Sequence, residues 1–418
     1  MGMNMKAGYG AQKLPSPIGV ELCGYGIYLK RICTGIGDEL HVRCVATEKD
    51  GVKSLLLSAD LIGLGDKPHA AIRELIADEL GLSGAQVMIV CTHTHTGPST
   101  NHLEGCGVES EAYNASIPPV FLEAAKEALG DMTDVESMET VLQPIEPIGY
   151  NRDTVNGPHD ANVRGFLLRR TNAAPIALFS YACHPVAIGM RTTASADYPG
   201  TLCRMATAEG MKPIFVTGCC GDINPVIQRI KWGSGTQETL DDYATRILQG
   251  FKAGLKPVEP CGIELKITEF DATLPLRNLD ADEIKDIADN SGTGGIGEVW
   301  KQEMLKRLPL PPTVTVKIRA LKIGPLTLCS VPYETFTAVG DMVRAAFPGE
   351  NIAVLGCADR TYSYLPVVTP GHERSYAIVS GSLLYLHPLF GSDAVERLAD
   401  QIAKGISIWF RHGDNNIS

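Results

Sequence analysis

The sequence lacks the features that mark several classes of protein. No apolar run approaches the roughly 20 residues that a membrane-spanning helix needs, and Met1–Gln12 has no hydrophobic segment of a signal peptide. The formal net charge is -11 and the basic residues form no stripe, which argues against nucleic-acid binding. We therefore expect a cytoplasmic protein that acts on a small molecule, with neither a nucleic acid nor a membrane as partner.

Cysteine motifs for metal or redox chemistry are also absent. The 12 cysteines are scattered, and no Cys-x-x-Cys pair occurs. Several lie in apolar runs, which favours small buried side chains in a reducing compartment. Cys219–Cys220 is the exception, because this pair adjoins a Gly-Asp turn and leaves a thiol nucleophile open.

A β-α-β pattern organises the first hundred residues. Glu39–Glu48 and Val52–Ala59 flank a Lys-Asp-Gly turn and predict a β-hairpin. Lys67–Leu80 carries an apolar stripe at helical spacing, and Gln86–Cys91 predicts a buried strand. A right-handed crossover makes the strands before and after this helix parallel, so that their carboxyl ends share one sheet edge. Open α/β sheets bind their ligands at such an edge.

The alternation of strands and helices continues along the chain. With 44% hydrophobic residues among 418, the chain can bury a large core. We predict one α/β domain over residues 1–418, with a mixed β-sheet core and flanking helices. Asn290–Gly297 is rich in glycine and predicts a flexible insertion at about 288–297. A phosphate loop is the alternative, but no strand precedes this segment and no Gly-Lys-Ser/Thr follows it. Further helices are predicted at Pro119–Leu129, Pro199–Glu209 and Asp393–Phe410, and strands at Ser137–Gln143, Val163–Arg170, Pro175–Cys183, Pro213–Thr217, Thr313–Ile323 and Leu326–Val331.

Two histidines follow the predicted strand Gln86–Cys91. In Thr92-His93-Thr94-His95, strand alternation directs both imidazoles to one face, just before a Gly-Pro turn. Two imidazoles at a strand end suggest a metal site. The alternative is a pair of buried, hydrogen-bonded histidines.

Three further polar clusters follow apolar runs. One buried strand ends at His184-Pro185, and another at Gly221-Asp222-Ile223-Asn224-Pro225. Glu334 follows a third strand and is expected to open a helix, where a carboxylate also serves as a simple N-terminal cap. A later loop carries Tyr364 and Tyr376, and tyrosines in loops often do no more than pack a ring.

Together these motifs resemble the catalytic domain of the neutral (non-lysosomal) ceramidase family. The order and rough spacing hold from about Pro15 to Leu389, so the resemblance covers nearly the whole chain. The family's Thr-His-Thr-His-Ser-Gly-Pro strand end is matched by Thr92–Pro98. The other matches are Asn151-Arg152, Cys183-His184, Gly221–Pro225 for Gly-Asp-Val-Ser-Pro, Pro332–Glu334, and Tyr364–Gly381 for the late tyrosine-rich loop.

The resemblance implies a zinc enzyme and a role for each matched residue. Zinc would be held by His93, His184, Glu334 and Tyr364. Two imidazoles and a carboxylate are a common catalytic zinc set, and the metal would activate water and polarise the scissile carbonyl. His95 would act as an acid or base beside the metal, Arg152 and Tyr376 would stabilise the oxyanion, and Asp197 would lie near the site.

Departures from the family change the expected substrate. Asn224 replaces the serine of the Gly-Asp-x-Ser-Pro motif; its amide can donate to an oxyanion but cannot be acylated, which favours attack by water. The chain ends soon after the last shared motif, so we expect no C-terminal β-sandwich domain and a small, soluble amide in place of ceramide. The alternatives are a metal-dependent esterase, lactonase or glycan-processing hydrolase, and a non-catalytic small-molecule or metal-binding protein.

Overall fold

The computed structural model describes residues 5–26, 30–231, 233–368 and 375–412. A mixed sheet of nine strands runs in the order β11-β9-β8-β6-β1-β3-β4-β5, with β13 beside β6. Its two halves join where β1 pairs with β6 at Lys6 and Ala7. The bounds are β1 Met5–Lys13, β3 His41–Lys49, β4 Val52–Ala59, β5 Val87–Cys91, β6 Thr133–Pro144, β8 Asn162–Arg170, β9 Ala173–Tyr181, β11 Lys212–Thr217 and β13 Lys256–Pro257.

Parallel strand pairs lie at both ends of this sheet. β4 and β5 are parallel and are connected through α1 (Asp66–Leu80), as the sequence predicts. β9 and β11 are parallel and are connected through α3 (Asp197–Ala208). The helix α1 buries Pro68, Ile72 and Ile76 at four-residue spacing. It stops at Gly81, whose left-handed backbone suits glycine.

A second sheet shares a buried core with the first. Its strands run in the order β14 (Leu265–Pro275), β15 (Thr313–Ile323), β16 (Leu326–Ser330) and β18 (Asn351–Leu355). One cluster of buried side chains draws on both halves of the first sheet and on the second. It includes Leu56, Met88, Phe166, Ile214 and Leu328.

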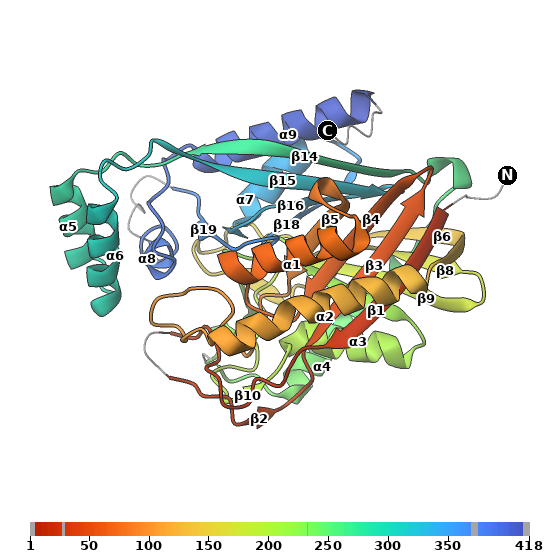
Figure 1. Ribbon diagram of the computed structural model, residues 1–418, viewed down its shortest axis with the longest axis horizontal. Coiled ribbons are helices and arrows are strands. Elements are labelled where there is room, and N and C mark those ends of the chain that lie inside the picture. Colours follow the sequence, from red (N-terminus) through yellow and green to blue (C-terminus); the bar gives the residue numbers. More distant parts are fainter. Residues whose placement is uncertain (1–4, 27–29, 232, 369–374, 413–418) are drawn as a thin grey trace.

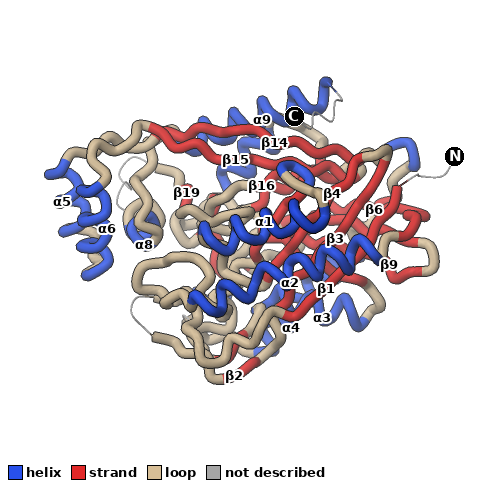
Figure 2. Tube along the Cα trace, viewed as in Figure 1, coloured by secondary structure: helices blue, strands red, loops and turns tan. Residues whose placement is uncertain are grey.

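Helices cover the outer faces of the sheets, and the strands lie inside (Figures 1 and 2). α2 (Glu111–Gly130) covers β1 and β3, and α1 packs beside α2 on the same half of the sheet, while α3 and α4 (Gln237–Ala253) cover the β6–β11 half. α9 (Ala394–His412) lies on β14 and packs against α7 (Thr337–Ala345). In the part of the chain described, no helix is both long and apolar enough to cross a membrane. The fold class predicted from the sequence is therefore confirmed.

Two predicted boundaries are wrong. The helix expected at Pro119 begins two turns earlier, because the Ser110 hydroxyl caps it by accepting the Tyr113 amide proton. The loop expected at Asn290–Gly297 is shorter, since α5 (Ala281–Asp289) is followed by α6 (Gly295–Lys306). These two helices pack on each other at one end of the molecule (Figure 1).

The remaining elements are short. They lie mostly in the segments that follow the long strands, where the polar motifs of the sequence also lie. They are β2 Gly35–Ile36, β7 Gly149–Asn151, β10 Thr193–Ala194, β12 Ile223–Pro225, β17 Glu334–Thr335, β19 Tyr364–Leu365 and α8 Ser380–Leu384, with single-turn helices at Gly84–Gln86, Val226–Arg229 and Pro260–Gly262.

Candidate metal centre

The carboxyl ends of strands from both sheets meet at one place. The Thr217 hydroxyl at the end of β11 donates to the Thr92 carbonyl just past β5, at 2.8 Å. The Cys91 amide donates to the carbonyl of Cys357, which follows β18. The Gly218 amide donates to Tyr181 at the end of β9. This convergence brings together polar motifs that are far apart in the sequence.

His93 is fully buried at this meeting point. Its Nδ1 lies 2.6 Å from the Ile62 carbonyl, and its backbone amide donates to Leu61. The strand β5 ends at Cys91, and His93 has a φ of 70°. His93 and His95 do come together, but a turn beyond the strand brings them there. The strand alternation expected from the sequence is not the cause.

His184 is held in the same way from the other half of the sheet. Its backbone amide and its Nδ1 both lie near the Ile223 carbonyl, at 3.0 and 3.1 Å. Ile223 belongs to β12, which is antiparallel to β7. The ring is fully buried and lies 4.9 Å from the ring of His93, centroid to centroid.

Glu334 completes the group from the segment that follows β16 of the second sheet. Its Oε2 lies 3.2 Å from Nε2 of His93 and 3.1 Å from Nε2 of His184, and the residue is 1% exposed. Glu334 lies in β17, next to Tyr364 of the parallel strand β19. The expectation that Glu334 opens a helix is wrong, because α7 begins only at Thr337. A simple capping role is therefore excluded.

The donor atoms of these three residues fit a cation. Because each imidazole directs Nδ1 to a backbone carbonyl, the proton is assigned to Nδ1 and the lone pair to Nε2. Both lone pairs then face an oxygen of the Glu334 carboxylate, which also presents lone pairs and no proton. Backbone carbonyls fix metal-binding histidines in this way.

His95 is a third imidazole at the same centre. Its Nε2 lies 3.3 Å from Nε2 of His93, and ligand atoms of His93, His95 and His184 all lie within 4.8 Å of one another. Burial, followed by the two neighbouring imidazoles, lowers the pKa of His95 well below its usual value. A neutral His95 suits either a metal ligand or a proton acceptor. We call His93, His95, His184 and Glu334 the histidine centre.

The segment around Gly24 covers His95. Arg31 donates through Nη2 to the carbonyls of Cys23 and His95, both at 2.7 Å. The Tyr25 ring meets the His95 ring edge-on at 5.5 Å between centroids. A Cβ atom at Gly24 would lie 2.4 Å from Nδ1 of His95, and the φ of Gly24 is 86°. Only glycine allows the backbone to come this close.

Arg152 lies beside Glu334 with two tyrosines. Its Nη2 donates to the Tyr364 hydroxyl and to the Gly221 carbonyl, both at 2.9 Å. The Tyr376 ring centroid is 5.7 Å from the Arg152 guanidinium carbon. No carboxylate of a described residue forms an ion pair with Arg152. Tyr376 is 53% exposed and borders solvent.

The Gly-Asp-x-Asn-Pro motif supports the centre through its backbone and through Asp222. Asp222 accepts from the Asn151 side chain at 2.8 Å and from the amide and hydroxyl of Thr337 at 2.9 Å. A Cβ at Gly221 would lie 2.5 Å from the Glu334 carbonyl oxygen. Asn224 is buried, and its Oδ1 has no hydrogen-bond partner. A buried acceptor without a partner is unusual in a folded protein.

The cysteines are free thiols, eleven of them buried and Cys261 exposed. Burial raises the pKa of Cys219, whose Sγ contacts the Val354 carbonyl, so it remains a thiol. Cys220 is also buried and interacts with the His184 imidazole. The expectation of small buried side chains is therefore confirmed for most of the set.

Asp197 is fully buried at the start of the helix α3. Its carboxylate accepts from the amides of Ile188 at 3.1 Å and Tyr198 at 2.8 Å. Burial raises its pKa to about 7. The nearby Ser195 carbonyl accepts from the hydroxyls of Thr94 and Thr96, which flank His95. The Ser195 carbonyl thus holds the backbone on both sides of His95, while the Asp197 carboxylate fixes the neighbouring backbone at Ile188 and Tyr198.

Sequence reasoning missed Tyr385 and the segment around Gly24. The Tyr385 hydroxyl donates to Oε1 of Glu334 at 2.6 Å. Tyr385 lies in an apolar run that is typical of a buried core segment, so no sequence signal indicated a role at the site. The stretch Gly24-Tyr25-Gly26 did carry a sequence signal, because two glycines around an aromatic residue indicate a backbone with positive φ angles.

Solved structures share this fold. No protein-family model matches the chain, and no curated protein matches it in sequence. A structure described as ceramidase complexed with C2 matches with a TM-score of 0.75 at 13% identity, over 98% of this chain and 76% of that one. Neutral ceramidase from Pseudomonas aeruginosa matches with a TM-score of 0.73 at 15% identity, over 98% of this chain and 75% of that one. The neutral-ceramidase-like fold expected from the motifs is therefore confirmed. At these identities the likeness concerns the fold alone.

Proposed function

We propose that the protein is a zinc-dependent hydrolase that cleaves the amide bond of a small molecule. One observation carries the proposal. Two buried imidazoles, each with Nδ1 committed to a backbone carbonyl, direct Nε2 at the same oxygen of a buried carboxylate. Such an arrangement is stable when a cation lies among these atoms.

His93, His184 and Glu334 would hold the metal, and Tyr364 is the proposed fourth ligand. The Tyr364 hydroxyl is buried next to Glu334 and receives the Arg152 hydrogen bond. Nitrogen and oxygen donors of this kind suit zinc. A bound zinc ion would polarise the substrate carbonyl and make a water molecule acidic near neutral pH.

The other residues of the site would handle charge and protons. Arg152 can stabilise the oxyanion that forms when water adds to the amide carbonyl, and Tyr376 can donate a second hydrogen bond there. His95 would first accept a proton from the attacking water, since its imidazole is neutral and lies beside His93, and would then donate this proton to the nitrogen of the leaving amine. Asn224 has no acylable hydroxyl, so its role is to hydrogen-bond the substrate.

A substrate panel with the purified protein tests the bond type. We expect turnover of small N-acyl amides, with slower turnover of matched esters. Turnover of esters, lactones or glycosides without any turnover of amides would replace the amidase proposal by one of these hydrolases. Binding of a panel member without turnover of any would indicate a non-catalytic protein.

Metal analysis of single variants tests the ligands independently of the substrate. His93→Ala and His184→Ala should each lose most of the bound metal. His159→Ala is the matched control, because His159 is exposed and lies outside the centre. Full metal content in both ligand variants would refute the assignment.

A further inference from the structure

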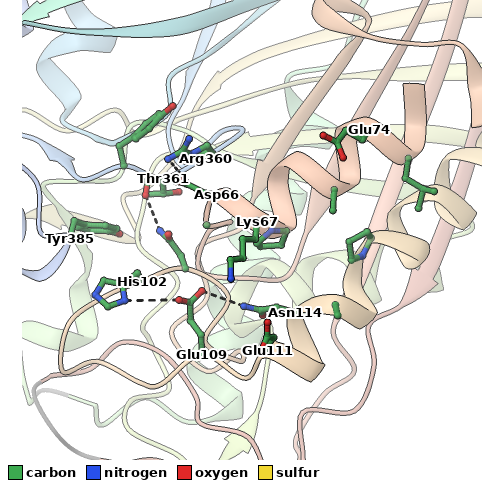
Figure 3. Close-up of a pocket in the computed structure, with 18 of the residues that line it drawn as sticks. Asp66, Lys67, Glu74, His102, Glu109, Glu111, Asn114, Arg360, Thr361 and Tyr385 are labelled. Atoms are coloured by element: carbon green, nitrogen blue, oxygen red, sulfur yellow. Dashed lines mark hydrogen bonds and ion pairs between the residues drawn. The ribbon is translucent and has the colours of Figure 1, made fainter. Parts of the chain in front are cut away.

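A cleft of about 1160 Å³ lies beside the histidine centre and is separate from it. It runs between α1 and the first turns of α2, and residues 360–362 and 385–387 form its inner end (Figure 3). We call it the α1–α2 cleft. Its volume lies slightly above the usual range of small-molecule sites, roughly 300–1,000 Å³. None of the roles proposed above uses it.

Carboxylates outnumber cations along this cleft. The lining residues include five carboxylates and three basic side chains: Asp66, Glu74, Asp78, Glu109 and Glu111, and Lys67, Arg307 and Arg360. Arg360 pairs with Asp66 inside the cleft, and Arg307 pairs with Glu303 outside its lining. Lys67 is left as the one basic side chain of the lining without an ion pair to a described residue. Its amino group points into the cleft (Figure 3).

Three of the carboxylates are without a cation. Glu74, Asp78 and Glu111 make no ion pair with any residue in the described ranges. Glu74 and Asp78 lie four residues apart on α1, so that two like charges share one face of the helix. Like charges at this spacing cost a helix a few tenths of a kcal/mol. A bound cation would relieve this repulsion.

Thr361 adds an independent sign of a ligand at the inner end. The residue is 3% exposed, lines the cleft, and its hydroxyl has no hydrogen-bond partner. Its carbonyl is already used, since it accepts from the Asn101 side chain at 2.8 Å (Figure 3). A buried polar atom without a partner is costly. An ammonium group, with three donors, would satisfy it.

Tyr385 forms the wall between the cleft and the histidine centre. It lines the cleft, while its hydroxyl donates to Glu334. An occupant of the inner end therefore lies one side chain away from the centre.

We propose that the α1–α2 cleft is a second binding site, which takes a small organic cation with primary ammonium groups. The unpaired carboxylates attract the cation, and the Thr361 hydroxyl accepts one of its hydrogen bonds. Binding is a property of the resting protein, so this proposal stands or fails independently of the hydrolase function.

Calorimetric titration with cadaverine tests the proposal, with pentanediol as the uncharged probe. We expect saturable binding of one cadaverine per chain and none of pentanediol. The double variant Glu74→Gln/Asp78→Asn should bind cadaverine roughly three- to tenfold more weakly, because exposed ion pairs contribute modest energies. This variant should fold, since it removes a repulsion from α1.

Two further variants test whether a positive charge in the cleft opposes binding and whether the cleft is the place where cadaverine binds. Lys67→Met should bind cadaverine roughly two- to fivefold more tightly, because it removes a like charge from the cleft. Glu136→Gln, an exposed carboxylate on β6, should bind like the unmodified protein. The proposal is overturned by no saturable binding, by unchanged affinity in the double variant, by weaker binding in Lys67→Met, or by equal weakening in Glu136→Gln.

Discussion

The histidine centre and the α1–α2 cleft lie on opposite sides of Tyr385 and are built in opposite ways. In the centre, His93, His184 and Glu334 are at most 1% exposed, and a backbone carbonyl fixes each of the two imidazoles. In the cleft, carboxylates such as Glu74 are exposed and have no described ionic partner. One region holds its polar groups rigidly in a dry interior, whereas the other leaves them free in water.

This difference separates two tasks. Charges interact strongly away from water, so a buried, preorganised group of ligands can stabilise charge that develops in a reaction. Exposed charges are screened by salt and interact weakly. They suit reversible attraction of a soluble ion.

The same change of Glu to Gln should act very differently in the two regions. Glu334→Gln removes the carboxylate that faces both imidazoles, and we expect metal loss and a loss of activity of about a thousandfold or more. Glu111→Gln, in the cleft, should change activity less than about twofold. Metal analysis and steady-state rates on the amide panel measure both. Similar effects in the two variants would contradict the contrast.

The buried Asp197 predicts a pH dependence of stability. Its pKa is about 7 when folded and about 4 when unfolded, so only the folded state keeps the proton between these values. This contribution to stability is complete below about pH 4, falls as the pH rises, and is lost above about pH 7. The side chain of the Asp197→Asn variant stays neutral at every pH. The free energy of unfolding of this variant, relative to that of the unmodified protein, should therefore rise by about 3 kcal/mol between pH 4 and pH 7.

Denaturant unfolding at a series of pH values measures this slope. Asp78→Asn is the control, because this carboxylate is exposed in the cleft and should leave the slope unchanged. A constant difference between Asp197→Asn and the unmodified protein at all pH values would show that Asp197 does not titrate in this range.

Gly24 tests whether His95 needs its covering segment. In Gly24→Ala the new Cβ would collide with the His95 ring, and we expect kcat to fall about a hundredfold while the metal is retained. Gly19→Ala is the matched control, because Gly19 also has a positive φ, 90°, but nothing lies within 4 Å of its Cβ position. If both variants lose the same activity, backbone strain explains the loss and the contact with His95 does not.

Tyr385 belongs to both regions and should show the smallest effect. Tyr385→Phe removes one hydrogen bond to Glu334 and leaves the ring in the wall of the cleft. We expect metal affinity or activity to fall about tenfold, as for other groups that orient a metal ligand. Cadaverine affinity should stay the same. A change in cadaverine affinity without a change at the centre would reverse the assigned roles.

The sequence predicted those parts of the molecule that depend on local patterns. Apolar spacing identified α1 and the strands around it, and the motifs at strand ends identified His93, His184 and Glu334. These patterns are local, because each reflects the residues of one helix or strand and those that directly follow it. The function of each residue then had to be taken from the resemblance to a family.

What the sequence did not predict depends on contacts between distant segments. Tyr385 reaches Glu334 across 51 residues, and Gly24 approaches His95 across a loop. The turn at His93, with its positive φ, gives no periodic signal. The place of Glu334 in β17 depends on its pairing with β19, which no local pattern encodes.

Anomalous X-ray scattering at the zinc absorption edge, from crystals grown without a chelator, tests the central claim most directly. The account predicts one strong peak among Nε2 of His93, Nε2 of His184 and the carboxylate of Glu334. The same crystals of His184→Ala should lack this peak. A peak that persists in this variant, or an unmodified protein with no peak at the histidine centre, would contradict the account.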